Sequence, residues 1–468
     1  MVREPYKIVM AFAFVAIGLS ITVSCKQKQT DATPWISLFD GETLNGWIQK
    51  GGNANYGVVD GAIVGTAVAD TPNSFLTSTN DYGDFILELE FKVDPKMNSG
   101  IQIRSNSYPF YLDGRVHGYQ VEIDPSDRAW SAGIYDEGRR GWLHPLDDAN
   151  VAAKKAFAQN DWNHYRVEAI GDTIQTWING QPAANLFDDQ TATGFIGLQV
   201  HSIYGDQKPG MQVAWRDIKI MTDELEKYQR DSPLPLRDNT NRLTKNESDQ
   251  GWKMLWDGKT TNGWRGAKLE DFPEKGWHME NGVLTVLPGD GGESTNGGDI
   301  VTLDKYGNFE LKVDFKLTEG ANSGIKYYVD TQLNKSEGSA IGLEYQILDD
   351  AKHPDAKLGS HEGSRTLASL YDLIQASPDK PALPIGEWNT ARILSKEGHV
   401  THYLNGAKVL EYQRKSPEYR QLVAESKYKV WPNFGELEEG LILLQDHGDK
   451  VSFRNIKIRP IHPKKETP

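Results

Sequence analysis

The sequence contains very little cysteine: Cys25 is the only one in 468 residues. A single cysteine cannot form an intramolecular disulfide, and it excludes cysteine-clustered zinc and iron–sulfur sites. Positive charge is also in deficit, because 51 Lys and Arg face 65 Asp and Glu and leave a formal net charge of −14. A chain this acidic repels nucleic acids and anionic membrane surfaces, so we expect no nucleic-acid partner.

Familiar catalytic motifs are missing as well. The sequence has no Gly-x-Ser-x-Gly nucleophile elbow, no P-loop, no His-Glu-x-x-His motif and no dinucleotide-binding glycine pattern. Glycine and proline are plentiful, with 45 and 22 residues, and together with alternating strand patterns they indicate an all-β protein with many turns. A hydrophobic content of 38% is enough for packed cores.

One uncharged run stands at the beginning of the chain. Arg3 and Lys7 precede 16 uncharged residues, Ile8 to Val23, and Cys25 follows them closely. A membrane-spanning helix needs about 20 apolar residues, so this run suits a secretory signal better. The pattern resembles a bacterial lipoprotein signal, with residues 1–24 removed, Cys25 acylated and residues 25–33 as a tether. The alternative is a plain signal peptide with an accidental cysteine.

This pattern predicts where the protein is found. We expect a cell-envelope protein that touches the membrane only through its lipid anchor, facing the periplasm or lying at the outer-membrane surface.

The rest of the sequence is one unit written twice. Leu38–Trp47 recurs as Leu255–Trp264, and Asn98-Ser-Gly-Ile recurs at Asn322. A period above 200 residues indicates duplicated domains rather than a solenoid. We therefore expect domains at 34–222 and 251–461, a linker at 223–250 that is partly helical, and a tail at 462–468.

The clearest periodicity predicts antiparallel β-sandwiches in both domains. Apolar and charged residues alternate over 85–93 and again over 309–317, as in half-buried strands. Asn179-Gly180 and Asn405-Gly406 are dipeptides typical of type I′ hairpin turns. The best candidates for short helices are 152–159 and 416–426.

Polar side chains alternate with apolar ones on three strands of each domain, which predicts one polar sheet face per domain. Glu122 lies two residues after Gln120, whereas the second copy has Glu344 before Gln346, so acid and amide have exchanged places. If these strands are neighbours, their polar side chains form a surface suited to a hydroxyl-rich ligand. The first-domain candidates are Gln102, Arg104, Gln120, Glu122, Asp124, Gln199 and His201; the second-domain candidates are Lys326, Tyr328, Glu344, Gln346, Gln445 and His447.

A loop that follows Glu122 adds aromatic and basic residues. Tyr135 and Trp142 offer flat apolar faces for sugar rings, and Arg139 lies between them. Taken alone, Glu122 or Glu344 on a strand is more often solvated sheet surface, and His201 or His447 is more often structural or solvent-exposed. Asp349, Asp350 and His353 could form a metal cluster, although their spacing in a polar loop is weak evidence.

At these residues the sequence resembles the bacterial 3-keto-disaccharide hydrolase family. The resemblance is carried in both domains by Leu-Phe-Asp-Gly-x-x-Leu-x-Gly-Trp at 38–47 and its partner at 255–264, by Asn-Ser-Gly-Ile, by Gly118–Asp124, and by Leu-Gln-Asp-His-Gly at 444–448. It implies two tandem concanavalin-like jelly-roll sandwiches that act on glycosides oxidised to a ketone at C3. The substrate would be an oligosaccharide or another glycoside.

The implied chemistry assigns roles to the candidates. A ketone at C3 acidifies the C2 proton, so a base can remove it while the aglycone leaves from C1. We expect His201 and His447 as bases or metal ligands, Glu122 and Glu344 as acid/base or ligand partners, Arg104 or Lys326 to stabilise negative charge, and Tyr135 or Tyr371 to contact the sugar. A divalent metal is left open as cofactor.

Three alternatives stay open. A two-carboxylate glycosidase would need a matched acid pair, whereas the repeat offers one acid and one amide per face. A carbohydrate-binding lipoprotein without activity needs no base. The first copy has Gln-Val-His where the second has Gln-Asp-His-Gly, so one catalytic and one sugar-binding copy would also fit.

Overall fold

The computed structural model describes residues 34–205, 207–289 and 292–462. The expected signal peptide (1–24), Cys25 and its tether (25–33) lie outside the described residues, as does the tail from 463 onward. In the part of the chain that the structure describes, no helix has the length and apolar character needed to cross a membrane.

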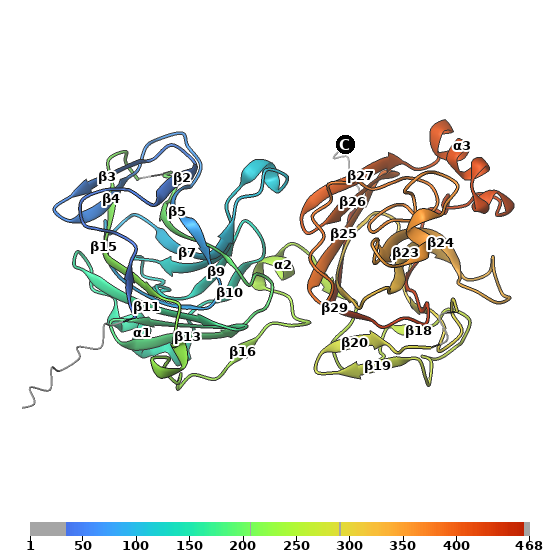
Figure 1. Ribbon diagram of the computed structural model, residues 1–468, viewed down its shortest axis with the longest axis horizontal. Helices are drawn as coiled ribbons and strands as arrows, with labels where there is room; N and C mark the ends of the chain where they lie inside the picture. Colours follow the sequence, from blue (N-terminus) through green and yellow to red (C-terminus); the bar gives the residue numbers. More distant parts are fainter. Residues whose placement is uncertain (1–33, 206, 290–291, 463–468) are drawn as a thin grey trace, which may run out of the picture. The chain divides into compact units, whose positions relative to one another are not determined.

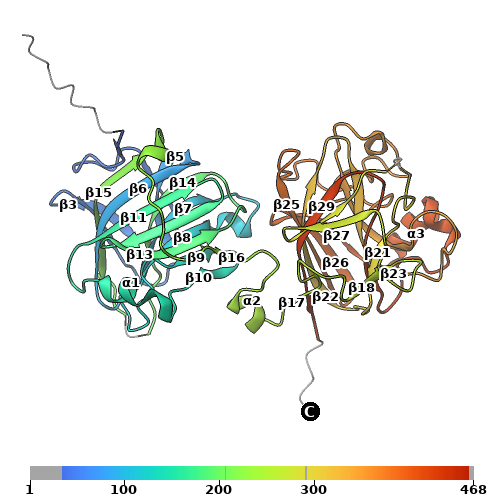
Figure 2. The same ribbon diagram turned by 90° about the horizontal axis from the view of Figure 1, so that it is seen from below.

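The first half of the chain is a sandwich of two β-sheets (Figures 1 and 2). Almost all neighbouring strands run antiparallel. The larger sheet has the order β16-β13-β12-β11-β6-β15-β4-β3 with β1 paired to β15, and the smaller sheet has the order β10-β9-β8-β7-β14-β5-β2. The strands are β1 (Ile36–Ser37), β2 (Trp47–Gly51), β3 (Asn55–Val59), β4 (Ala62–Thr66), β5 (Ser74–Tyr82), β6 (Phe85–Val93), β7 (Ser99–Asn106), β8 (His117–Ile123), β9 (Ile134–Glu137), β10 (Gly141–His144), β11 (Asn163–Ile170), β12 (Thr173–Ile178), β13 (Gln181–Phe187), β14 (Gly194–Val200), β15 (Gln212–Met221) and β16 (Arg237–Asp238).

The second half repeats this architecture. Its larger sheet has the order β19-β20-β29-β22-β25-β26-β27 with β17 paired to β29, and its smaller sheet has the order β18-β21-β28-β23-β24. The strands are β17 (Lys253–Met254), β18 (Trp264–Gly266), β19 (Trp277–Glu280), β20 (Val283–Val286), β21 (Ile300–Thr302), β22 (Phe309–Leu317), β23 (Asn322–Asp330), β24 (Ile341–Leu348), β25 (Trp388–Lys396), β26 (His399–Leu404), β27 (Ala407–Gln413), β28 (Leu441–Leu444) and β29 (Val451–Pro460). The fold class expected from the sequence, two tandem jelly-roll β-sandwiches, is confirmed.

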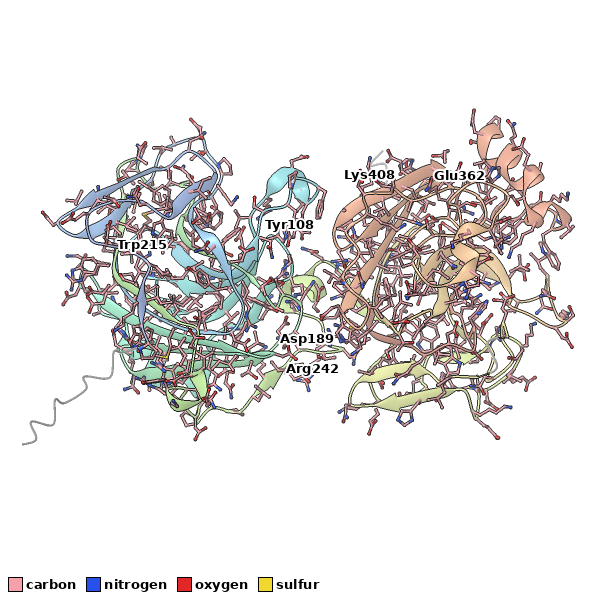
Figure 3. All side chains as sticks on the ribbon, in the orientation of Figure 1. Tyr108, Asp189, Trp215, Arg242, Glu362 and Lys408 are labelled. Carbon is pink, nitrogen blue, oxygen red and sulfur yellow. The ribbon has the colours of Figure 1, made fainter. Side chains whose placement is uncertain are left out.

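The two alternating segments form the centre of each sandwich. β6 and β22 cover the expected residues, and every second side chain of each strand faces a core between two sheets. Trp215 of β15, labelled in Figure 3, is fully buried in the first core. Asn179-Gly180 and Asn405-Gly406 have positive φ at both residues, as type I′ turns require.

The helices are short and begin where the sequence predicts. α1 spans Val151–Ala156, and α3 spans Pro417–Glu425. Ser416 caps α3 by accepting a hydrogen bond from the backbone N–H of Tyr419, and Pro417 takes the first helical position, where no backbone donor is needed. The segment 223–250 contains α2 (Lys245–Asp249), which begins with a capping box at Thr244.

A β-bulge in each domain overturns part of the predicted polar face. Between Ile103 and Asn106, β7 holds one residue more than its partner β8, and Arg104 has a positive φ of 45°. β23 has the same bulge between Tyr327 and Asp330, with Tyr328 at φ 53°. An extra residue breaks the alternation of faces, so the prediction that Arg104 and Tyr328 face outward with the other candidates was wrong.

Both side chains belong to the interior instead. Arg104 is 1% exposed and donates hydrogen bonds to the carbonyl oxygens of Gly83 and Gly171 and to the carboxylate of Asp84. Tyr328 packs in the second core, and its hydroxyl bonds Ser395 at 2.7 Å. Arg104 and Tyr328 therefore each stabilise the interior of their own sandwich.

Candidate functional site

A cavity of about 470 Å³ lies over the smaller sheet of the first domain. Tyr119, Val121 and Ile123 of β8 point into the core, so Gln120 and Glu122 point to the opposite side, where the cavity lies. The cavity brings together the predicted residues Gln120, Glu122, Asp124, Tyr135, Trp142 and His201, and it adds others such as Asn98, Arg115, Arg128, Glu137 and Tyr204.

Glu122 is the buried acid of this cavity, with 4% of its surface exposed. Its carboxylate accepts hydrogen bonds from the side-chain amides of Asn98 at 2.7 Å and Gln120 at 2.9 Å, and Arg128 lies 3.4 Å away. Burial nevertheless outweighs these contacts and raises the pKa of Glu122 from 4.5 to about 7. Near neutral pH this carboxyl can therefore give or take a proton.

His201 follows β14 and is held by one hydrogen bond. Its Nδ1 lies 2.7 Å from the carbonyl oxygen of Ser202. A carbonyl oxygen only accepts, so Nδ1 carries the ring proton, and Nε2 of the neutral ring has a free lone pair. The ring of Tyr204 meets the imidazole edge-on at 6.1 Å. His201 is thus arranged to act as a base through Nε2.

An aromatic and cationic wall completes the cavity. The ring of Trp142 packs edge-on against Tyr135 at 5.2 Å and against Trp130 at 4.7 Å. The guanidinium of Arg128 lies 4.6 Å from the ring of Trp130 and 5.0 Å from that of Trp142. Such a wall suits a sugar ring, because it joins a flat apolar surface to hydrogen-bond donors.

The cavity contains one acid, Glu137, that the sequence analysis did not identify. Besides Glu122, it is lined by Asp124 and Glu137. Asp124 pairs with Arg128 at 2.8 Å, and Glu137 pairs with Arg115 at 2.9 Å. The expectation of one acid per face was therefore wrong for the first domain; Glu137 was missed because β9 is too short to show a period. Asn98, whose repeated Asn-Ser-Gly motif could have signalled a role, supports Glu122.

Besides Arg104, three predicted first-domain residues lie away from the cavity. Arg139 pairs with Asp136 at 2.7 Å and lies over the ring of Tyr119, 5.3 Å from its centre. Gln102 and Gln199 are fully buried, and the amide of Gln102 bonds that of Gln120 from beneath. The expectation that these three line the substrate cavity was wrong, because Gln102 and Gln199 are covered by neighbouring residues and Arg139 is held by Asp136.

In the second domain the acid lies at the strand position that an amide occupies in the first domain. β23 pairs Lys326 with Glu344 and Gly324 with Gln346, whereas β7 pairs Gln102 with Gln120 and Gly100 with Glu122. Glu344 thus occupies the place of Gln120, and acid and amide are exchanged in space as in sequence.

A buried ion pair holds this second acid. Lys326 lies 3.5 Å from Glu344 and 3.8 Å from Glu293. Burial raises the pKa of Glu344 despite the charge of Lys326. Burial alone would lower the pKa of Lys326, but the charges of Glu344 and Asp299 outweigh it and raise that pKa.

The remaining second-domain candidates surround this pair. Gln346 donates to Asn322 at 3.3 Å, and Gln445 donates to Glu293 at 3.0 Å. The hydroxyl of Tyr371 donates to Asp355 at 2.9 Å, and the ammonium of Lys427 lies 4.3 Å from its ring centre. Glu293 and Lys427 were missed because they come from loops without periodicity.

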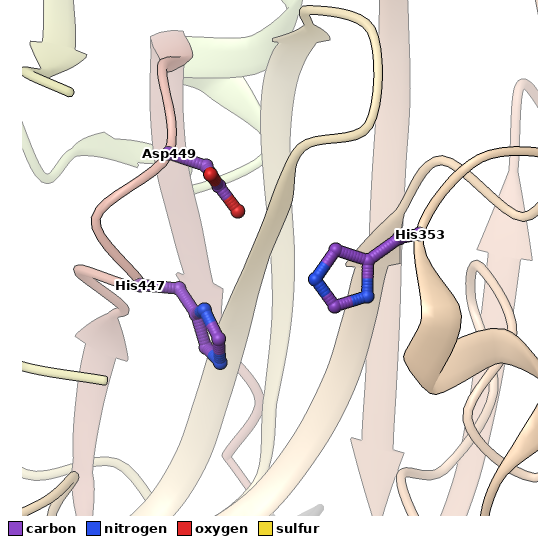
Figure 4. A group of neighbouring side chains, drawn as sticks. All are labelled: His353, His447 and Asp449. Atoms are coloured by element: carbon purple, nitrogen blue, oxygen red, sulfur yellow. The ribbon is translucent and has the colours of Figure 1, made fainter. Parts of the chain in front are cut away.

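His447 belongs to a further cluster (Figure 4). Ligand atoms of His353, His447 and Asp449 all lie within 4.8 Å of one another, and the three side chains point toward a common space. In the described part of the chain, this is the one group of three His, Cys, Asp or Glu side chains close enough together to hold a metal ion. It could bind a divalent cation.

Of the cluster suggested by the sequence, only His353 takes part. Asp349 accepts a hydrogen bond from the backbone N–H of Gly320, and Asp350 pairs with Lys380 at 2.8 Å.

Asp446 stands at a position where the two copies differ, and its carboxylate binds backbone N–H groups of nearby loops. One carboxylate oxygen accepts the backbone N–H groups of Gly297 and Gly298, both at 2.8 Å, and the other accepts that of Gly448 at 2.9 Å. A carboxylate with three backbone donors anchors a loop, and this loop carries Glu293.

Known proteins resemble parts of this chain. A 3-keto-disaccharide hydrolase from Bacteroides thetaiotaomicron is 40% identical over 229 residues, which cover 45% of this chain and 78% of that protein. A solved candidate glycosyl hydrolase from Parabacteroides distasonis is 33% identical over 48% of this chain and all of its own, with a TM-score of 0.42. A carbohydrate-binding module from Bacillus subtilis is 16% identical over 38% of this chain and 95% of its own, with a TM-score of 0.28. The family model described as the 3-keto-alpha-glucoside-1,2-lyase-like domain matches residues 34–221 and again 251–459, and the chain belongs to this family.

Proposed function

We propose that this protein is an enzyme that cleaves 3-keto-glycosides, in particular 3-keto-disaccharides. The observation that carries the proposal is the first-domain cavity, where a buried carboxyl and a histidine whose Nε2 has no hydrogen-bond partner among the described residues line one sugar-sized space. Family membership and the name of the Bacteroides relative support the same substrate class. The chemistry of a 3-keto sugar needs those two groups, as follows.

The first step is removal of the C2 proton. Nε2 of His201 takes this proton, and the electrons of the C2–H bond form an enolate with the C3 ketone. Charge then lies on the C3 oxygen, and Arg128 and the amide of Asn98, which line the cavity beside Glu122, would donate hydrogen bonds to it. Arg128 takes the role that the sequence assigned to Arg104.

The second step breaks the C1–O bond. The enolate electrons move to form a C1–C2 double bond, the C3 ketone is restored, and the aglycone leaves with the electron pair of the C1–O bond. Protonated Glu122 gives its proton to the departing oxygen, a role that its pKa of about 7 suits near neutral pH. Water adds to C1 and C2 regains a proton, which completes hydrolysis; release before this addition is a lyase reaction.

The second domain has the same residue types in another order. We propose Lys326 and Glu344 as its charge-stabilising and acid/base groups, His447 as base or metal ligand, and Tyr371 as a sugar contact. A divalent cation bound in this domain would polarise the ketone and so favour the same proton transfer.

The rival mechanism uses two carboxylates on an unoxidised sugar. Asp124 and Glu137 are each paired with an arginine in the cavity, which disfavours either as a nucleophile. A protein that only binds carbohydrate would need no raised carboxyl pKa and no base. Both alternatives make different predictions from elimination.

The test compares an oxidised disaccharide with its unoxidised parent. The full chain should cleave the 3-keto-disaccharide and leave the parent intact, and His201→Gln with His447→Gln together should abolish turnover. His278→Gln, at an exposed histidine, is the matched control. Cleavage of the unoxidised sugar would contradict the proposal in favour of the two-carboxylate mechanism. Binding by isothermal titration calorimetry without turnover would favour a carbohydrate-binding protein.

We also propose that Cys25 carries the lipid anchor and that the domains act in the cell envelope. Cys25→Ala should release the protein from the membrane fraction. Retention of this variant in washed membranes would overturn the anchor.

A further inference from the structure

We propose that the second domain binds one divalent transition-metal ion through His353, His447 and Asp449, and that the first domain works without a metal. His447 and Asp449 follow β28, while His353 lies in the loop after β24. Their ligand atoms lie within 4.8 Å of one another, and all three side chains are half-buried. An ion sits about 2.1 Å from each nitrogen or oxygen donor, so small side-chain rotations would close the site.

An unused nitrogen points independently to a ligand. Nδ1 of His447 is buried and has no hydrogen-bond partner among the described residues. Buried polar atoms are rarely left unpaired, because an unpaired donor or acceptor costs free energy. The imidazole of His353 lies close by, with its ring centre 6.0 Å from that of His447.

Backbone hydrogen bonds decide which atoms of the other two ligands are available to an ion. Asp449 accepts the backbone N–H of Asn322 at 3.0 Å through one oxygen, which leaves the second oxygen available. Nδ1 of His353 accepts the N–H of Asp355 at 3.2 Å, so Nε2 is the nitrogen left for an ion. Binding through Nε2 moves the ring proton to Nδ1, and we expect this long hydrogen bond to break.

The donor set selects the kind of ion. Two imidazoles and one carboxylate suit Mn²⁺, Fe²⁺, Co²⁺, Ni²⁺ or Zn²⁺, whereas Ca²⁺ and Mg²⁺ prefer oxygen ligands alone. Three protein ligands leave coordination positions open. This step rests on the proposed function. The open coordination positions fit the ketone oxygen and a neighbouring hydroxyl of a 3-keto sugar, so the ligand class is an α-hydroxy ketone.

Among its described residues, the first domain has no such donor set. His201 corresponds to His447, but Ile203 stands where the second copy has Asp449, and residues 124–132 contain no histidine. His201 also commits its Nδ1 to the carbonyl of Ser202. The two domains are therefore expected to differ in metal dependence.

The test titrates Mn²⁺ and Zn²⁺ separately into the metal-free full chain by isothermal titration calorimetry, without any sugar. We expect about one ion per chain, and at least about tenfold weaker binding in Asp449→Asn and His353→Asn. Asparagine at 449 can still accept the Asn322 N–H, and asparagine at 353 is itself a favoured cap, so both variants should fold. Circular dichroism and thermal melting without metal check this.

Two controls locate the ion. His201→Gln should leave binding unchanged, and His278→Gln should do so for an exposed histidine. Three results would each overturn the proposal. One is unchanged binding in Asp449→Asn and His353→Asn, and another is no binding at millimolar metal. The third is binding of two ions, of which His201→Gln removes one. Because no sugar is present, these outcomes are independent of the proposed reaction.

Discussion

The raised pKa of Glu122 predicts a pH-dependent cost to folding, which Glu122→Gln should remove. Burial raises this pKa from 4.5 to about 7, so the folded state holds the proton more tightly than the unfolded chain does. The stability from this proton is complete below the unfolded pKa and is lost as pH rises toward and through about 7. A glutamine at this position cannot ionise, so its contribution does not vary with pH.

The size of the effect follows from the shift. A difference of roughly 2.5 pKa units corresponds to about 3.4 kcal/mol at high pH, at 1.36 kcal/mol per unit. About a quarter of this is already lost near pH 5, so about 2.5 kcal/mol is lost between about pH 5 and pH 8.5. The variant also carries a constant penalty of roughly 1–3 kcal/mol, because the new amide N–H₂ faces the Gln120 donor.

The assay is urea unfolding of the full chain and of Glu122→Gln at both pH values, with each domain transition fitted separately. The free energy of unfolding of the variant, relative to the natural chain, should rise by about 2.5 kcal/mol from pH 5 to pH 8.5 in one transition. Glu42→Gln, which removes a carboxyl from an exposed position, is the matched control for lost charge. A constant difference between the two pH values would refute the account of Glu122 as a buried acid with a raised pKa.

Three further predictions concern the bulges and the cavity wall. Arg104→Ala removes the donor from three backbone carbonyl oxygens, one of them buried and two partly buried, together with the ion pair to Asp84. It should therefore destabilise the first domain by about 3 kcal/mol in urea unfolding and change kcat little; a loss of activity in the folded variant would restore Arg104 to the site. Gly440→Ala places a Cβ 2.4 Å from the backbone of Tyr328, so thermal melting should show that the free energy of unfolding falls by about 1–3 kcal/mol. Unchanged stability would contradict the close approach of Gly440 to the Tyr328 backbone. Trp142→Ala removes a face of the cavity wall, so KM for a 3-keto-disaccharide should rise about tenfold with a smaller change in kcat, and an unchanged KM would show that the sugar binds elsewhere.

The elements most predictable from sequence were those whose signal is local. The alternation in β6 and β22 and the Asn-Gly turns depend on a few adjacent residues, and the structure has them at the expected positions. The shared face of Gln120 and Glu122 follows from the same period of two. A local pattern was therefore enough to predict which side chains of β8 face the site.

The rest depends on contacts between distant segments. A bulge at Arg104 or Tyr328 changes the face of a side chain without changing the hydrophobic pattern enough to be seen. His353 meets His447 across 94 residues of sequence, and Arg128 reaches Glu122 from a loop. Whether Gln199 is open to solvent depends on what covers it, which no single strand reveals.

Elimination through the C3 ketone can be tested directly with a 3-keto-disaccharide that carries deuterium at C2 of its oxidised sugar. The account predicts that the sugar loses this deuterium to water at the rate of cleavage, with a primary kinetic isotope effect, and that His201→Gln with His447→Gln stops both. Cleavage that leaves the deuterium on C2 would contradict the account, because the glycosidic bond would then break without an enolate.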